Sequence, residues 1–266
     1  MTLIFPHSSA DVQGRSVVSN AVEIEMRTQH LQIAERRTAL LAPTDLKLTT
    51  NNFYSASNMS NVNNNSFTRV TKRTIDLVVA CVALVTLLPF FIFVALAIKM
   101  DSRGPVLFRQ VRWGKDCKKI GVYKFRSMHF AQCDVTGVAQ TTRNDPRITR
   151  VGEFLRRTNI DELPQLLNVL KGDMSLVGPR CHAVGMLAGG VTYEELVPDY
   201  HERHLVRPGI TGLAQMRGLR GPTDRPSKAR ARITSDLYYV RHMSIALDVR
   251  IMVGTVISEL RGGKGF

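Results

Sequence analysis

The sequence predicts a small, irregular domain of mixed α/β class joined to one membrane helix. A run of 22 residues without a charged side chain, from Leu77 to Ile98, is followed by short patterns typical of strands and helices. With 266 residues and 44% hydrophobic content, the chain can fill one sizeable core. We therefore expect a mobile tail and linker over residues 1–70, a membrane element over residues 71–99 and a globular domain over residues 100–266.

The first 70 residues offer little to a core. A weakly amphipathic helix is compatible with residues 22–41, but residues 51–65 contain seven Asn and three Ser. The excess positive charge lies elsewhere, because the chain carries +14 and residues 71–266 alone carry +13. That charge favours anionic partners such as phospholipid head groups, a phosphorylated lipid, a nucleotide or a nucleic acid.

The uncharged run is the predicted membrane element. As a straight helix it would extend about 33 Å, enough to cross the hydrocarbon layer of a bilayer. Basic residues lie on both sides of it, Lys72 and Arg73 before and Lys99 after, and cytoplasmic flanks are the ones that collect such residues. Pro89 lies within the run, where it removes a helical hydrogen bond and bends the axis. A spanning helix and a re-entrant helix that breaks at Leu88-Pro89 are nearly equal alternatives from these residues alone.

Beyond the run, short strands alternate with helices. Period-two and helical patterns predict strands at residues 106–108 and 120–125 and helices at residues 151–155, 159–170 and 245–260. Asn159 is expected to cap the second of these helices, and Lys171-Gly172 is expected to end it.

Two adjacent carboxylates, Asp161 and Glu162, stand near the start of that second helix. Neighbouring helical side chains diverge by about 100°, so the pair cannot share one proton and must have different roles. The start of a helix favours anions, and Arg156 and Arg180 flank the pair in the sequence. A carboxylate that attacks a diphosphate needs Mg²⁺ and cationic side chains to neutralise the repulsion, and both acids are suitable ligands for that ion. The alternative is structural, with two acids that only complement the helix dipole.

Two further basic groups have open interpretations. Lys124 and Arg126 alternate at the end of a predicted strand, so they face one side and could meet phosphate, lipid head groups or only solvent. The other group comprises Arg225, Lys228, Arg230 and Arg232. These four residues could form a membrane-surface patch or an exposed helix face.

Several classes of site lack support in the sequence. The four cysteines show no CxxC spacing, so neither a zinc site nor a disulfide framework is indicated, and a reducing compartment is expected. His182, His201 and His204 have no metal-binding partner at helical spacing, so we expect satisfied or exposed histidines. The glycines form neither a GxGxxG nor a P-loop pattern, and the first residues do not resemble a signal peptide, so secretion is not expected.

A set of motifs occurs together and in order over about residues 70–266. Its members are Lys72-Arg73, Asp76, the apolar run with its proline, Gly104-Pro105, KFRSM at 124–128, DELPQLLNVLKGDMSLVGPR at 161–180 and RPGITG at 207–212. The set resembles the bacterial sugar transferase family, the polyisoprenyl-phosphate hexose-1-phosphate transferases with a monotopic membrane anchor. The segment GLRGPTDRPSKARARI is most similar to members that initiate exopolysaccharide repeat units.

The resemblance implies a two-step transfer with Asp161 as the nucleophile. Asp161 would attack the sugar-linked phosphate of a UDP-sugar and release UMP, and undecaprenyl phosphate would then take the phosphosugar. By the same resemblance Glu162 would help to hold Mg²⁺ or assist catalysis, Arg156 would bind phosphate, and Pro179 with Arg180 would border the nucleotide. Glucose or galactose is the expected sugar.

The resemblance also implies a location. The apolar run would be a re-entrant hairpin broken at Leu88-Pro89, followed by a cytosolic catalytic domain with amphipathic helices at the membrane interface. The enzyme would be monotopic in the bacterial inner membrane, among anionic lipids, with its active site on the cytoplasmic face. Two rival functions remain, a non-catalytic membrane scaffold of the polysaccharide machinery and a membrane-tethered nucleic-acid-binding protein. No recognisable binding motif supports the latter, so no nucleic-acid partner is expected.

Overall fold

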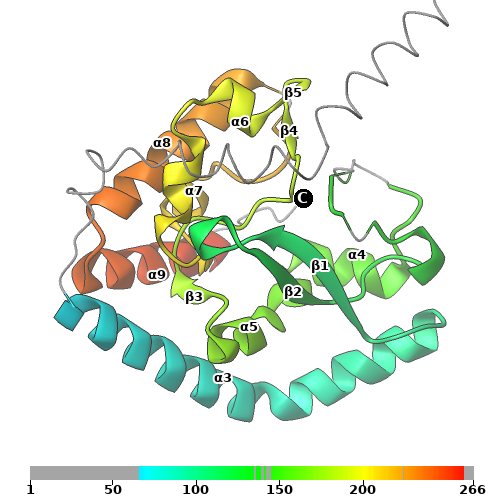
Figure 1. Ribbon diagram of the computed structural model, residues 1–266. Helices are drawn as coiled ribbons and strands as arrows, with labels where there is room; N and C mark the ends of the chain where they lie inside the picture. The colour runs from blue at the N-terminus through cyan, green and yellow to red at the C-terminus, as the bar shows by residue number, and fades with distance from the viewer. Residues whose placement is uncertain (1–65, 135, 139–140, 142–144, 224, 261–266) are drawn as a thin grey trace, which may run out of the picture. The chain divides into compact units, whose positions relative to one another are not determined.

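The computed structural model describes residues 66–134, 136–138, 141, 145–223 and 225–260 (Figure 1). These residues form a mixed α/β domain with one long apolar helix at its start, which confirms the predicted class. The predicted tail helix at residues 22–41 and the predicted mobility of residues 1–65 lie outside the described residues.

The long helix α3 covers Ser66–Asp101, so it begins earlier than the predicted membrane element. Its length and composition are sufficient to cross a membrane, and few of its side chains are buried. Leu88 and Pro89, the predicted break, lie exposed inside the helix, and α3 bends near its middle (Figure 1). Pro89 has no N–H to donate to the preceding turn, which is a common cause of such a bend.

The first part of α3 is held to the domain by polar side chains. Lys72 donates to the carbonyl of Val177 at 3.0 Å, and Arg73 donates to the carbonyl of Val169 at 2.7 Å. Asp76 is buried and accepts from the hydroxyl of Ser175 at 2.7 Å and from the backbone N–H of Leu176 at 3.0 Å. These contacts join α3 to strand β3, Ser175–Val177, and, through Arg73, to helix α5, Gln165–Lys171.

The last turns of α3 contact the same domain. The carboxylate of Asp101 accepts from the N–H of Val151 at 3.1 Å, at the start of α4, Arg150–Arg157. Phe91 packs edge-on against Phe125 with ring centroids 5.4 Å apart. The guanidinium of Arg126 donates to the carbonyls at the C-terminal end of α3 and just beyond it. Both ends of the helix are therefore attached to one globular body.

The hairpin β1–β2 is the largest strand pair. Its strands are Leu107–Trp113 and Lys119–Phe125, paired in antiparallel register from Leu107 opposite Phe125 to Trp113 opposite Lys119. The predicted strands are thus confirmed, and the first continues further than expected. Asn168 of α5, Gln165–Lys171, is fully buried beside β2, accepting from the N–H of Tyr123 at 2.9 Å and donating to the carbonyl of Gly121 at 2.8 Å.

The remaining described elements complete a core beneath α3. The short strands are β4, Leu187–Ala188, paired with β5, Val191–Thr192, and β6, Gly209–Thr211, which runs parallel to β3. The helices are α6, Tyr193–Leu196; α7, Leu213–Met216; α8, Pro226–Arg241; and α9, Ile245–Leu260. Short 3₁₀ segments occur at η2, Lys115–Cys117; η3, Phe130–Gln132; η4, Ile160–Glu162; and η5, Tyr200–Leu205. The helix predicted at residues 245–260 is confirmed.

The basic group on α8 is not one surface. Arg225 and Arg230 are exposed, but Arg232 is buried and donates to the carbonyls of Leu219 at 3.0 Å and Gly221 at 2.8 Å. Arg232 therefore holds the loop before α8 in place and does not belong to an exposed face or a membrane-surface patch.

We predict that Asp76→Ala lowers the free energy of unfolding by about 2–3 kcal/mol, because it leaves the buried N–H of Leu176 without its acceptor and removes one of the two acceptors of the buried Ser175 hydroxyl. The measurement is the melting temperature of the purified protein in detergent. Thr74→Ala, two residues earlier on an exposed part of α3, is the matched control. Equal melting temperatures for Asp76→Ala and the wild type would show that this anchor is dispensable.

Candidate active site

The two carboxylates lie on a tight turn and not at the start of a long helix. The sequence predicted one helix capped by Asn159, and this prediction is wrong: Asn159 has a left-handed backbone with φ 55°, and its side chain makes no cap. Pro164 has no N–H for the carbonyl of Ile160, which instead accepts from Leu163 at 3.1 Å in the tighter 3₁₀ pattern. α5 begins after this turn and ends at Gly172, as predicted, with φ +89°.

Glu162 is the centre of an ion cluster. Its Oε1 accepts from Lys124 Nζ at 2.7 Å, and Arg180 approaches as a fork, with Nη1 2.9 Å from Oε2 and Nη2 on Oε1. Burial would raise the pKa of Glu162, but Arg180 and Lys124 together hold it well below its usual range. Glu162 is therefore a permanent anion that fixes two cations from β2 and from the segment after β3.

Asp161 has the opposite electrostatic environment. It is 6% exposed, and its carboxylate accepts no hydrogen bond from any residue that the structure describes. Burial raises its pKa to about 6, with Glu162 adding to the rise and with Lys124, Arg156 and Arg180 opposing it. At neutral pH Asp161 is thus a partly desolvated anion whose oxygens are open to an incoming electrophile or metal ion.

The structure gathers most of the predicted cationic residues around this pair. Lys124, Arg156 and Arg180 all act on the charge of Asp161. Arg156, on the last turn of α4, donates to the hydroxyl of Thr141 at 2.8 Å. Pro179 is buried beside Arg180, and its carbonyl accepts from the N–H of Gly209 at 3.0 Å, which holds the Arg180 segment against β6.

Arg126 is the exception and corrects the interpretation of Lys124 and Arg126 as a pair. Its side chain is 1% exposed, and its guanidinium donates to the carbonyl and hydroxyl of Ser102 at 2.6 and 3.0 Å and to the carbonyl of Arg103 at 3.0 Å. The C-terminal carbonyls of a helix attract a cation, so Arg126 caps α3. The structure does not bring it to the carboxylates.

The pair offers a donor set that fits Mg²⁺. Carboxylate oxygens are the hard ligands that this ion prefers, and Asp161 has both oxygens open among the described residues. A carboxylate has about four lone-pair sites, so the three contacts of Glu162 leave one for a metal ion or its water. Mg²⁺ at Asp161 and Glu162 stays a prediction.

Two residues that the sequence did not single out support the site. Asn168 fastens α5 to β2, which sets the carboxylate turn opposite Lys124. Arg203 on η5 is fully buried, pairs with Asp236 at 2.7 Å and donates to the backbone carbonyl of Arg180. Neither has a local signal, because each acts on a segment distant in sequence.

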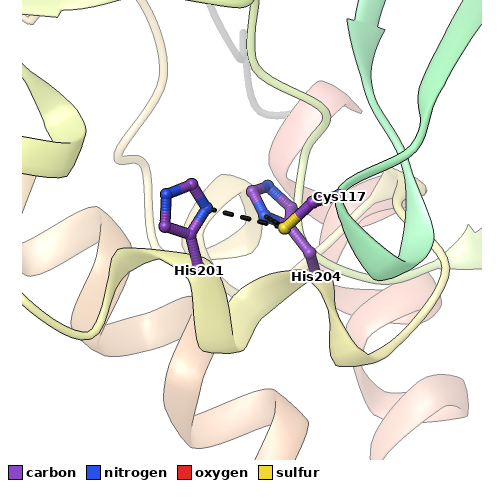
Figure 2. Close-up of side chains that lie close together, drawn as sticks. All are labelled: Cys117, His201 and His204. Carbon is purple, nitrogen blue, oxygen red and sulfur yellow. Dashed lines mark hydrogen bonds between the residues drawn. The ribbon is translucent and has the colours of Figure 1, made fainter. Parts of the chain in front are cut away.

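The histidines also depart from expectation. His182 is buried, with Nδ1 3.1 Å from the hydroxyl of Tyr200, but its Nε2 has no hydrogen-bond partner among the described residues, so the histidine is only half satisfied. His201 and His204, however, both lie beside Cys117, which the sequence did not connect with them (Figure 2). None of the four cysteines, all of which the structure describes, forms a disulfide.

Comparison with known proteins gives a consistent result. The sequence profile described as "Bacterial sugar transferase" matches residues 67–262. The "Exopolysaccharide production protein PSS" of Rhizobium leguminosarum bv. phaseoli is 71% identical over 197 residues, which are 74% of this chain and 98% of that protein.

Two more distant relatives have names that state a reaction. A protein of Escherichia coli K12 is 50% identical over 74% of this chain, and one of Caulobacter vibrioides is 48% identical over 71% of it. Both are named "UDP-glucose:undecaprenyl-phosphate glucose-1-phosphate transferase". The chain aligns with only 40% of the Escherichia coli protein and with 69% of the Caulobacter protein.

We predict that Asp161→Asn stabilises the protein at neutral pH. The raised pKa means that deprotonating Asp161 costs more in the folded than in the unfolded state, so its destabilising effect appears as the pH rises from 4 through about 6. A shift of this size corresponds to about 3 kcal/mol at most. Thermal unfolding should therefore show a higher melting temperature for Asp161→Asn than for the wild type at pH 7.5 and a much smaller difference at pH 4. A variant that is less stable at pH 7.5 would contradict this account of the buried carboxylate.

Proposed function

The chain belongs to the bacterial sugar transferase family, and we propose that it transfers hexose 1-phosphate from a UDP-sugar to undecaprenyl phosphate, with release of UMP. Glucose is the sugar that the names of the Escherichia coli and Caulobacter relatives favour. The name of the Rhizobium relative, nearly all of which aligns with this chain, favours a role in exopolysaccharide production, where this transfer would be the first step of repeat-unit assembly.

One observation carries the chemical part of the proposal. Asp161 is buried and has open oxygens, while the carboxylate beside it is paired with two cations, Lys124 and Arg180. In a first step, an oxygen of Asp161 bonds to the sugar-bearing phosphorus as the bond from that phosphorus to the UMP oxygen breaks. In a second step, an oxygen of undecaprenyl phosphate bonds to the same phosphorus and Asp161 leaves. The covalent intermediate lets one site serve two substrates in turn.

The surrounding cations have a defined task in this scheme. A carboxylate and a diphosphate repel each other, so the encounter needs positive charge already in place. Lys124 and Arg180 are held by Glu162, and Arg156 is held near Ser127 and Thr141. Mg²⁺ bound by Asp161 and Glu162 would add charge neutralisation for the phosphates and the departing UMP.

For the membrane we propose a re-entrant α3, bent at Leu88-Pro89, with both ends on the cytoplasmic side of the inner membrane. The support is that a straight helix of 36 residues would be about 54 Å long, yet side chains from both of its ends bind one globular domain. The middle of α3 exposes an apolar surface that suits lipid, which includes Val82, Val85, Leu88, Ile92, Phe93 and Leu96.

α9 would extend this membrane surface as an interfacial helix. Its exposed apolar side chains are Val249, Val253, Val256 and Ile257, a spacing that forms one stripe along the helix. The net positive charge would draw the domain to anionic lipids, where undecaprenyl phosphate presents its head group. The catalytic domain in this arrangement begins after α3.

We predict that Asp161→Asn abolishes transfer, because an amide cannot form the phosphoryl-enzyme bond. Purified protein would be incubated with UDP-glucose, Mg²⁺ and undecaprenyl phosphate, and UMP release would be measured. Wild-type enzyme given donor alone should also gain the mass of a hexose phosphate on the peptide that contains Asp161. Asp199→Asn, an exposed acid elsewhere in the domain, should keep full activity. Wild-type turnover by Asp161→Asn, after mass spectrometry has excluded deamidation, would assign the nucleophile elsewhere.

We predict that both ends of α3 are shielded from the outside of the cell. Single cysteines would replace the exposed Ser66 and Lys99 in an active variant without the native cysteines. A membrane-impermeant maleimide should label neither position in spheroplasts and both positions after lysis. Labelling of one position in intact spheroplasts would restore the spanning helix.

A further inference from the structure

A thiol and two imidazoles meet at the turn of the β1–β2 hairpin, and none of them contacts the carboxylate pair in the described residues. The sulfur of Cys117 lies 3.6 Å from Nδ1 of His201 and 3.4 Å from Nδ1 of His204 (Figure 2). The sulfur and one nitrogen of each ring all lie within 4.8 Å of one another. His204 is buried, and the other two are half-buried. The trio is not part of the transfer chemistry proposed above.

The two histidines are presented together by their backbone. They are three residues apart on η5, and a 3₁₀ helix has three residues per turn, so both rings leave the same side of it. Figure 2 shows both rings rising from η5 toward Cys117, which comes from the turn η2. The ring centroid of Trp113, on β1, lies 6.0 Å from that of His204 and 6.5 Å from that of His201, so the indole packs beside both imidazoles.

The turn that carries Cys117 has an unfavourable backbone for a residue with a side chain. Asp116 and Cys117 both have φ 54°, and Lys118 donates to the carbonyl of Lys115 at 3.1 Å. Two positive φ angles in sequence are typical of a type I′ turn, in which Gly is preferred at the second position. Cys117 occupies that position, where a residue with a Cβ is strained. The thiol of Cys117, the residue in this strained conformation, points at the imidazoles of His201 and His204.

The distances fit shared coordination of one ion. In a tetrahedral zinc site, with Zn–S of about 2.3 Å and Zn–N of about 2.0–2.1 Å, the sulfur and a ligand nitrogen are about 3.6 Å apart. Both sulfur–nitrogen distances here are close to that value. A neutral thiol has a single proton and can donate to only one of the two nitrogens, whereas a metal thiolate satisfies both through the ion.

We propose that Cys117, His201 and His204 form a binding site for a borderline-soft divalent transition metal, with Zn²⁺ as the best chemical match. One thiolate and two imidazoles suit Zn²⁺ and disfavour Mg²⁺, which prefers oxygen ligands. Three protein ligands leave a fourth position for water or another small ligand.

The bound ion would connect two segments that the backbone leaves 84 residues apart. On one side is the β1–β2 hairpin, which carries Lys124. On the other is η5, from which Arg203 donates to the backbone carbonyl of Arg180. The metal would thus fasten the hairpin to the 3₁₀ turn that supports Arg180.

Cobalt provides the direct test. Full-length protein without a histidine tag would be stripped with a chelator and titrated with Co²⁺. We expect about one equivalent to bind, with a thiolate-to-Co²⁺ charge-transfer band and the intense visible bands of four-coordinate Co²⁺. Zn²⁺ should displace it and abolish the bands. Cys133→Ser, which removes a different half-buried thiol, should leave the spectrum unchanged.

Cys117→Gly separates metal binding from folding. Gly suits the positive φ, so the variant should be at least as stable as the wild type in chelator. Zn²⁺ at a hundredfold excess over Kd should raise the melting temperature of the wild type by about 5–10 °C and that of Cys117→Gly by almost nothing. Wild-type protein that binds no Co²⁺, or Cys117→Gly that keeps the charge-transfer band or the Zn²⁺ shift, would overturn the proposal and leave only a thiol hydrogen-bonded to histidine.

Discussion

The ion cluster centred on Glu162 is the interaction on which the site depends. It joins β2 through Lys124, the 3₁₀ turn η4 through Glu162 itself, and the segment after β3 through Arg180. These groups are largely shielded from water, so each charge is tolerable only while its partners are present. Removing Glu162 would leave two desolvated cations without their shared partner, which is why these three segments keep one arrangement before any substrate binds.

The same cluster explains how two neighbouring carboxylates acquire different properties. Glu162 accepts hydrogen bonds from two cations and stays ionised. Asp161 feels the positive charge of the same cations but accepts no hydrogen bond from them. Environments that separate the pKa values of adjacent acids are a common way to assign them different roles. The expected consequence is a site that is less stable and more reactive than a fully paired one, because the open oxygens of Asp161 are not compensated in the free protein.

The helix α3 combines an apolar middle with polar ends that bind the globular domain. Its middle is exposed and uncharged, but its two ends carry the buried Asp76 and the half-buried Asp101, each with a backbone N–H as partner. Polar contacts at both ends constrain the helix far more than its hydrophobicity does, since burial in lipid is not directional. The attachment to one domain therefore determines how α3 lies relative to the carboxylates.

The sequence alone determined the features that have a local signal: the apolar run, the hairpin strands, the helix end at Gly172, the closing helix and the acid pair. Periodicity and turn chemistry act over a few residues, so they can be read along the chain. Only the tertiary structure decided that Arg126 caps α3 while Lys124 reaches Glu162, and that Cys117 lies with His201 and His204. The partners in these contacts lie between 24 and 87 residues apart, and pairing over such separations leaves no periodic trace because it is produced by packing of the whole core.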